Sequence, residues 1–155
     1  MAPLWILCHD GKLDEVRSSL ACGEDVDDKS PNGITALMFA VRNPKNKRGE
    51  TALMRAVDQR HNSIVELLLD QPGVKTNEKD TNGWTALHYA VVYNNPEGAR
   101  MLLLHPTMDS ANAKDNDGDT AVMTAVIRGH KEVLSELVAH QSVSLDIGNV
   151  VGSGR

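Results

Sequence analysis

The residue types that most often perform nucleophilic catalysis occur together once, as Cys8, His9 and Asp10. Such catalysis requires a thiol or hydroxyl beside a histidine that a third group orients. Consecutive residues on a helix do not face one another, so these three side chains do not form a triad locally. We interpret Cys8 as a small buried residue and the other two as solvated side chains. The chain is therefore predicted not to be an enzyme.

Metal-binding chemistry is also not indicated. The six histidines form no i, i+4 pair, and the two cysteines have no CxxC spacing. The acidic run at 115–119 resembles a calcium loop only in part, because Gly118 is its fourth residue instead of its sixth and Val126 stands where the glutamate is needed. No Walker or dinucleotide glycine pattern is present. We expect no metal and no cofactor.

Composition narrows the class of partner. The 155 residues carry a net charge of −5, whereas nucleic-acid-binding proteins usually show a basic excess, so no nucleic acid is expected. No apolar stretch is long enough for a transmembrane helix, so no membrane insertion is expected. Two cysteines are too few for a disulfide framework and favour a reducing compartment. We predict a cytoplasmic protein, with a nuclear location as the alternative.

A short phrase recurs along the chain and predicts its helices. Thr-Ala-Leu or Thr-Ala-Val begins at Thr35, Thr51, Thr85 and Thr120, and the last two gaps are 34 and 35 residues. A glycine stands two residues before each threonine, as tight turns require, and the threonine is suited to cap a helix. Apolar residues follow at i, i+3 and i+4, and a second apolar segment comes after each first one. Such a helix pair is too small to bury its own apolar face and must stack on copies of itself.

These features resemble the ankyrin-repeat family, whose period is about 33 residues. The best match is DTNGWTALHYA at residues 80–90. The resemblance implies an all-α solenoid of stacked helix-turn-helix units with short β-turn loops. Alanine replaces the family's usual proline, and only His88 keeps the usual histidine, which in the family ties adjacent turns together. Fewer hydrogen bonds between turns are therefore expected here.

The repeats are predicted at about 1–29, 46–79, 80–114 and 115–144. The extra copy of the phrase at Thr35 indicates a half-repeat insertion at about 30–45, which either bulges from the array or docks irregularly inside it. Residues 145–155 form a tail or a truncated next repeat. The chain is predicted to be a monomer, with self-association through the uncapped C-terminal repeat as a further prediction.

The resemblance also places a binding surface on the turn tips and first helices. Three of the five aromatic residues gather there, and these rings either form a binding patch or pack between repeats. The predicted partner-binding residues are Trp84, Tyr89, Tyr93, Thr81, Asn82, Val92, Arg55, Asp58, Asp119 and Arg128. By the same resemblance, Asn77 and Asn112 are candidate hydroxylation sites, each with a leucine eight residues upstream.

The sequence therefore predicts a non-catalytic module that binds another protein or peptide, as a scaffold, an adaptor or a docking inhibitor. The alternative is a targeting or regulatory segment of a larger enzyme or channel. A family of this kind indicates how a partner is bound, and not which partner it is.

Overall fold

The structure is a computed structural model that describes residues 45–108 and 111–145. The predicted first repeat at 1–29 and nearly all of the half-repeat at 30–45 lie outside the described residues. The described residues form six helices and no strand, with one isolated bridge between Lys114 and Thr120. The predicted all-α class is confirmed.

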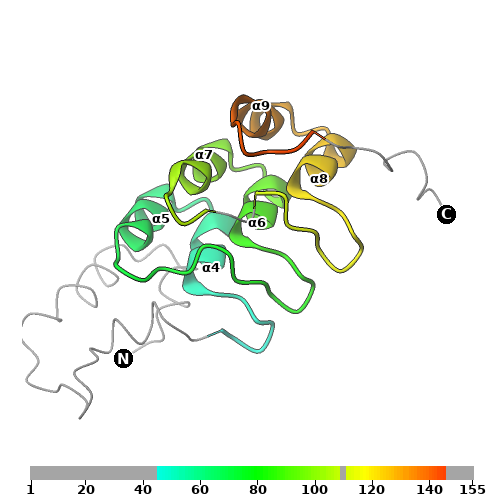
Figure 1. The fold of residues 1–155 in the computed structure, drawn as a ribbon. Coiled ribbons are helices and arrows are strands. Elements are labelled where there is room, and N and C mark those ends of the chain that lie inside the picture. The colour runs from blue at the N-terminus through cyan, green and yellow to red at the C-terminus, as the bar shows by residue number, and fades with distance from the viewer. Residues whose placement is uncertain (1–44, 109–110, 146–155) are drawn as a thin grey trace, which may run out of the picture.

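The helices come in three consecutive pairs. Their bounds are Ala52–Asp58 for α4, Asn62–Leu69 for α5, Ala86–Val92 for α6, Pro96–Leu104 for α7, Ala121–Arg128 for α8 and Lys131–Ala139 for α9. The first helices contact one another in the order α4, α6, α8, and the second helices do so in the order α5, α7, α9. The result is two layers of helices, with the long loops projecting from the layer of first helices (Figure 1).

Each first helix begins at the threonine of the recurring phrase. The hydroxyls of Thr51 and Thr120 accept hydrogen bonds from the amides of Met54 (3.2 Å) and Met123 (3.3 Å), which satisfies an amide that has no partner within the helix. In α6 the histidine takes a larger part, because Nδ1 of His88 accepts from the Thr85 amide at 3.2 Å. The predicted capping role of the threonines is thus confirmed for α4 and α8.

The turn before α6 packs directly on the turn before α8. Gly83 has φ of +80°, and a Cβ atom there would lie 2.8 Å from the amide nitrogen of Asn116. Glycine is needed for both reasons, since other residues rarely adopt this φ and the neighbouring backbone leaves no space. The same contact carries a hydrogen bond from the Asn116 amide to the Asn82 carbonyl (3.0 Å). Adjacent turns are therefore joined through their backbones.

Small residues at the centre of the stack let the first helices approach closely. Ala56, Ala90 and Ala125 are fully buried and occupy equivalent positions in α4, α6 and α8. Larger core residues fill the space toward the second helices, among them Leu87 and Leu102. Burying one such leucine stabilises the fold by roughly 1.5–3 kcal/mol.

The residues that precede the second helices α7 and α9 each tie one repeat to the one before it. The Asn95 side-chain amide donates to the Val57 carbonyl at 3.2 Å. At the equivalent place, Nδ1 of His130 bonds to the Val91 carbonyl at 2.8 Å. Both carbonyls lie in the last turn of a first helix, where backbone acceptors lack helical partners. These bonds fix the rotation of one pair relative to the next.

The last helix pair exposes apolar residues that earlier pairs bury. Val126 is 37% exposed, whereas the equivalent Val57 and Val91 are fully buried. Val138 is 50% exposed, while its equivalents Leu69 and Leu103 are buried. This face of α8 and α9 has the character of a stacking surface. Self-association through it stays a prediction.

Candidate protein-docking surface

Equivalent residues of the first helices form rows across the solenoid. The row at the helix ends consists of Gln59, Tyr93 and Arg128, all of them exposed. The adjacent row contains Val92 and Ile127, of which Ile127 is exposed. The row is linked to the long loops through Tyr93. Its ring stacks on Tyr89, whose hydroxyl is hydrogen-bonded to loop residues Glu50 and Asp80. The first helices and the loops therefore share one surface.

The three aromatic rings of the middle repeat form one cluster. The rings of Tyr89 and Tyr93 stack with their centroids 6.1 Å apart and an interplanar angle of 14°. Trp84 meets Tyr89 edge to face at 5.5 Å, and its Nε1 donates to Oδ2 of Asp115 at 3.2 Å. Aromatic pairs in such geometries contribute about 0.5–1.5 kcal/mol beyond their burial. The three rings lie together in the structure, as the sequence predicts.

The prediction that Tyr89 is an exposed contact residue is wrong. Its side chain is only 3% exposed, and its hydroxyl lies 3.0 Å from Oε1 of Glu50 and 2.9 Å from Oδ2 of Asp80. Burial, followed by the hydrogen bond to Asp80, raises the pKa of Tyr89. For Tyr89 the packing interpretation holds. Its buried ring stacks on Tyr93 and supports that exposed ring.

The predicted contact residue Asp58 is also buried, which corrects its assignment to the surface. Its Oδ2 accepts from Nη1 of Arg55 at 2.6 Å, and the same nitrogen lies 3.6 Å from Oε1 of Glu50. Arg55 is half-buried and balances part of the charge of these carboxylates. Arg55 and Asp58 therefore form a paired, largely buried part of α4 beneath the exposed surface.

What remains accessible is a smaller patch on α6 and α8. Tyr93 is 44% exposed, and burial of the rest of the ring raises its pKa. Val92 is half-buried beside it, and Ile127 and Arg128 are exposed on the next helix. The patch thus combines one aromatic ring, two aliphatic side chains and one cation. Trp84 is half-buried and packs against the core.

The turn tips add polar groups held by the backbone. The hydroxyl of Thr81 donates to the Arg48 carbonyl at 3.0 Å, and the exposed Asn82 has its amide bonded to Oδ1 of Asp80 at 2.8 Å. Asp119 is half-buried, and its carbonyl accepts from Nε2 of His88 at 3.3 Å. The tips are therefore fixed in place before a partner arrives.

The two asparagines predicted as hydroxylation sites join one long loop to the next. Nδ2 of Asn77 donates to the Thr107 carbonyl, and Nδ2 of Asn112 donates to the Ser142 carbonyl, each at 2.7 Å. The side-chain Oδ1 of Asn112 also accepts from the Ser144 backbone amide at 2.6 Å. These bonds explain asparagine at both places by structure alone. Hydroxylation stays a prediction.

Neither metal-binding nor membrane-spanning features occur in the described part of the chain. Residues 45–108 and 111–145 contain no group of three or more His, Cys, Asp or Glu side chains placed to hold a metal ion. None of the helices α4 to α9 has the length and apolar character needed to cross a membrane.

The geometry of stacked helix pairs, threonine caps and paired turns agrees with comparison to known proteins. A family model described as ankyrin repeats in three copies matches residues 42–115, and a single ankyrin repeat matches residues 117–150. The chain belongs to the ankyrin-repeat family. Members of this family are protein-interaction modules, which confirms the coarse functional class predicted from the sequence.

The chain is also similar to several curated proteins over part of its length. The chain is 34% identical over 92 residues to SMC5-SMC6 complex localization factor protein 1 of Mus musculus, covering 59% of this chain and 8% of that protein. The Bos taurus protein of that name is 38% identical over 76 residues, covering 49% of this chain and 7% of the relative. BTB/POZ domain-containing protein 1 of Schizosaccharomyces pombe is 40% identical over 62 residues, covering 39% of this chain and 5% of that protein. The chain spans less than a tenth of the length of these relatives.

Proposed function

We propose that this chain is a non-catalytic docking module that binds another protein or peptide at the patch around Tyr93. The observation that carries the proposal is the stacking of exposed Tyr93 on buried Tyr89. The supporting ring is itself held by two carboxylates, so Tyr93 is oriented before binding and loses little side-chain entropy on contact. Tyrosine and arginine are enriched among residues that dominate binding energy.

The charges around the ring favour a partner with a mixed surface. Arg128 is exposed and has no ion pair among the described residues, so it is available to a partner's carboxylate. Arg55 is paired with Asp58 and therefore does not present a free cation to a partner. Val92 and Ile127 supply apolar contact between these charges. The patch therefore suits a partner segment with an apolar side chain beside an acidic one.

The module acts as a scaffold, an adaptor or a docking inhibitor, and it serves equally well as the targeting segment of a longer protein. The similarity to proteins named localization factors supports this second form, in which the repeats bring a larger assembly to its place. The exposed face of α8 and α9 leaves room for a further stacked element in either case.

A comparison of variants in a pull-down experiment tests the proposal. Replacing Tyr93 with alanine, alone or with Arg128→Ala, should weaken capture of specific partners by about tenfold or more. Arg100→Ala is the control, because the Arg100 side chain is similarly exposed (47%) but lies on α7, in the other layer of helices. Circular dichroism must show retained helicity in each variant. Equal loss of partners in the control, or full retention in Tyr93→Ala, would count against the proposal.

A further inference from the structure

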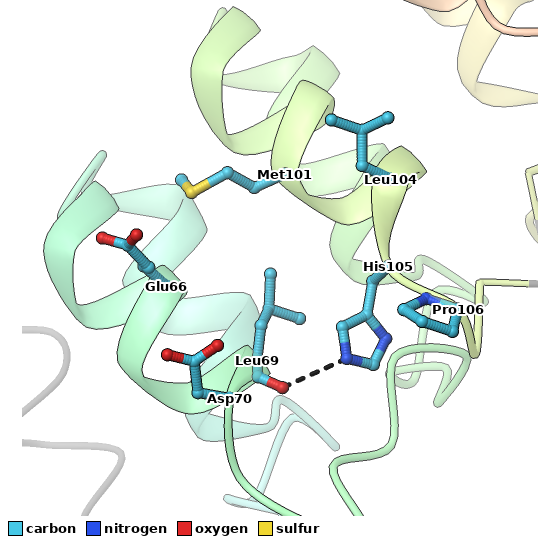
Figure 2. Close-up of a pocket in the computed structure, with 7 residues that line it drawn as sticks. All are labelled: Glu66, Leu69, Asp70, Met101, Leu104, His105 and Pro106. Carbon is cyan, nitrogen blue, oxygen red and sulfur yellow. Dashed lines mark hydrogen bonds between the residues drawn. The ribbon is translucent and has the colours of Figure 1, made fainter.

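A groove lies between the second helices α5 and α7 (Figure 2). These helices belong to the layer opposite the first helices α4, α6 and α8 (Figure 1). Its volume is about 250 Å³. The lining is mostly apolar and comes from Leu69 on α5 and from Met101 and Leu104 on α7. Leu104 is 65% exposed, which leaves an accessible apolar edge on one side of the groove.

The size of the groove limits what it can hold. Sites for whole small molecules usually enclose about 300–1,000 Å³ and surround most of the ligand. This groove is smaller and open to solvent on one side. It fits one or two apolar side chains of a polypeptide better than it fits a complete metabolite.

One wall of the groove is fixed by hydrogen bonds. Nε2 of His105 donates to the Leu69 carbonyl at 3.1 Å, the bond drawn in Figure 2. Its Nδ1 lies 2.9 Å from the hydroxyl of Thr107 and also accepts from that residue's amide. Both ring nitrogens are therefore engaged, and the imidazole serves as a rigid wall that joins α5 to the end of α7.

The opposite rim carries two carboxylates. Glu66 on α5 and Asp70, which caps the C-terminal end of that helix, are both exposed and stand four residues apart, so they are separated by about 6 Å along the helix axis. Neither carboxylate forms an ion pair with any residue in the described ranges. The rim is therefore negative and unneutralised, and it lies directly beside an apolar groove.

We propose that this groove binds a basic amphipathic helix of a partner protein. A leucine-like side chain of that helix enters between Met101 and Leu69, and two lysines or arginines one turn apart pair with Glu66 and Asp70. An amphipathic helix laid in an apolar groove is a recurring mode of peptide recognition. The site is separate from the patch around Tyr93, so either proposal stands or fails without the other.

The probe for this site is a fluorescein-labelled amphipathic helix made of leucine and lysine, with binding followed by fluorescence anisotropy. Replacing both rim carboxylates (Glu66→Lys with Asp70→Lys) should weaken binding about fivefold to tenfold, because two exposed ion pairs are lost. The matched control is Glu132→Lys with Glu136→Lys, which makes the same charge change at the same spacing on α9. The control should bind the probe nearly as the unmodified chain does.

Methyl NMR places the probe on the molecule. The Met101 methyl lines the groove, whereas Met123 belongs to α8 and is buried, so the probe should shift the first signal and leave the second unchanged. A probe whose leucines are replaced by serine should shift neither. An unchanged Met101 signal, or equal weakening by the rim and control charge changes, overturns the proposal and attributes binding to the net negative charge of the chain.

Discussion

Replacing Tyr89 with phenylalanine removes one hydroxyl group from beneath the proposed docking patch. In the folded protein this hydroxyl lies within 3.0 Å of carboxylate oxygens of both Glu50 and Asp80. Because both carboxylates are buried, neither regains full hydration after the substitution. A hydrogen bond to a charged group contributes about 1.5–3 kcal/mol, so we expect Tyr89→Phe to lower the free energy of unfolding by that amount.

Urea denaturation followed by circular dichroism measures this change, which should appear as a lower midpoint with an unchanged slope. The matched control is Tyr93→Phe, because the Tyr93 hydroxyl makes no hydrogen bond with any described residue and the ring is 44% exposed. The control should alter stability by less than about 0.5 kcal/mol. Equal effects of the two substitutions would refute the assignment of Tyr89 as a buried donor to the carboxylates.

Alkaline pH should destabilise the wild-type protein more than it destabilises Tyr89→Phe. Burial raises the pKa of Tyr89 in the folded state above its unfolded value of about 10. Its contribution is therefore fully present below about pH 10 and declines as pH rises, since the unfolded chain ionises first. The wild-type protein should lose about 1.4 kcal/mol per pH unit more than Tyr89→Phe above that pH. A constant difference between the two proteins from pH ~9 to ~11 would contradict this reasoning.

Three further predictions concern backbone geometry and His88. Gly83→Ala should destabilise by about 2–4 kcal/mol, and Gly118→Ala by only about 1–2, because both have positive φ but only Gly83 lies against another backbone; urea denaturation compares them. Arg60→Gly should stabilise by about 0.5–1 kcal/mol, because Arg60 has φ of 58° where the equivalent position of the last repeat is Gly129; differential scanning calorimetry measures this. Burial lowers the pKa of His88, so its contribution is present above pH ~6.5 and is lost as pH falls. His88→Met, which copies the residue of the neighbouring repeats, should therefore reduce the loss of stability between pH ~7.5 and ~5.5 in thermal melts.

The sequence predicts the periodic parts of this fold well because they depend on local chemistry. Threonine after a glycine turn caps a helix wherever it occurs, and the structure begins α4, α6 and α8 after Thr51, Thr85 and Thr120. Alternating helix pairs follow from the spacing of apolar residues alone. Each of these features involves residues within a few positions of one another.

The fate of individual aromatic residues is harder to predict from the sequence. Tyr89 in α6 and Tyr93, which caps the end of that helix, are chemically identical and stack on one another, yet one is buried and the other is exposed. The difference arises from Glu50 and Asp80, which belong to two different turns and cover the Tyr89 hydroxyl. Asp80 begins the turn before α6 and is a local signal for such a partner, whereas Glu50 comes from the turn before α4 and reaches Tyr89 only through the stacking of repeats.

The groove between α5 and α7 has no counterpart in a single stretch of sequence. Its walls come from residues more than thirty positions apart, including the contact between His105 and the Leu69 carbonyl. Periodicity places Leu104 on an amphipathic second helix without showing whether a neighbouring helix covers it. Only the packed arrangement reveals that this leucine is exposed beside unneutralised carboxylates.

The most direct test of the docking proposal is photo-cross-linking from position 93. A benzophenone amino acid is incorporated there in place of tyrosine, and in a second protein it replaces the exposed Arg100 on α7. We expect partner cross-links from position 93 that are absent or much weaker from position 100, and competition by unmodified chain should abolish them. Cross-links that form from position 100 alone would contradict docking at Tyr93 and move the docking surface to the opposite layer of helices.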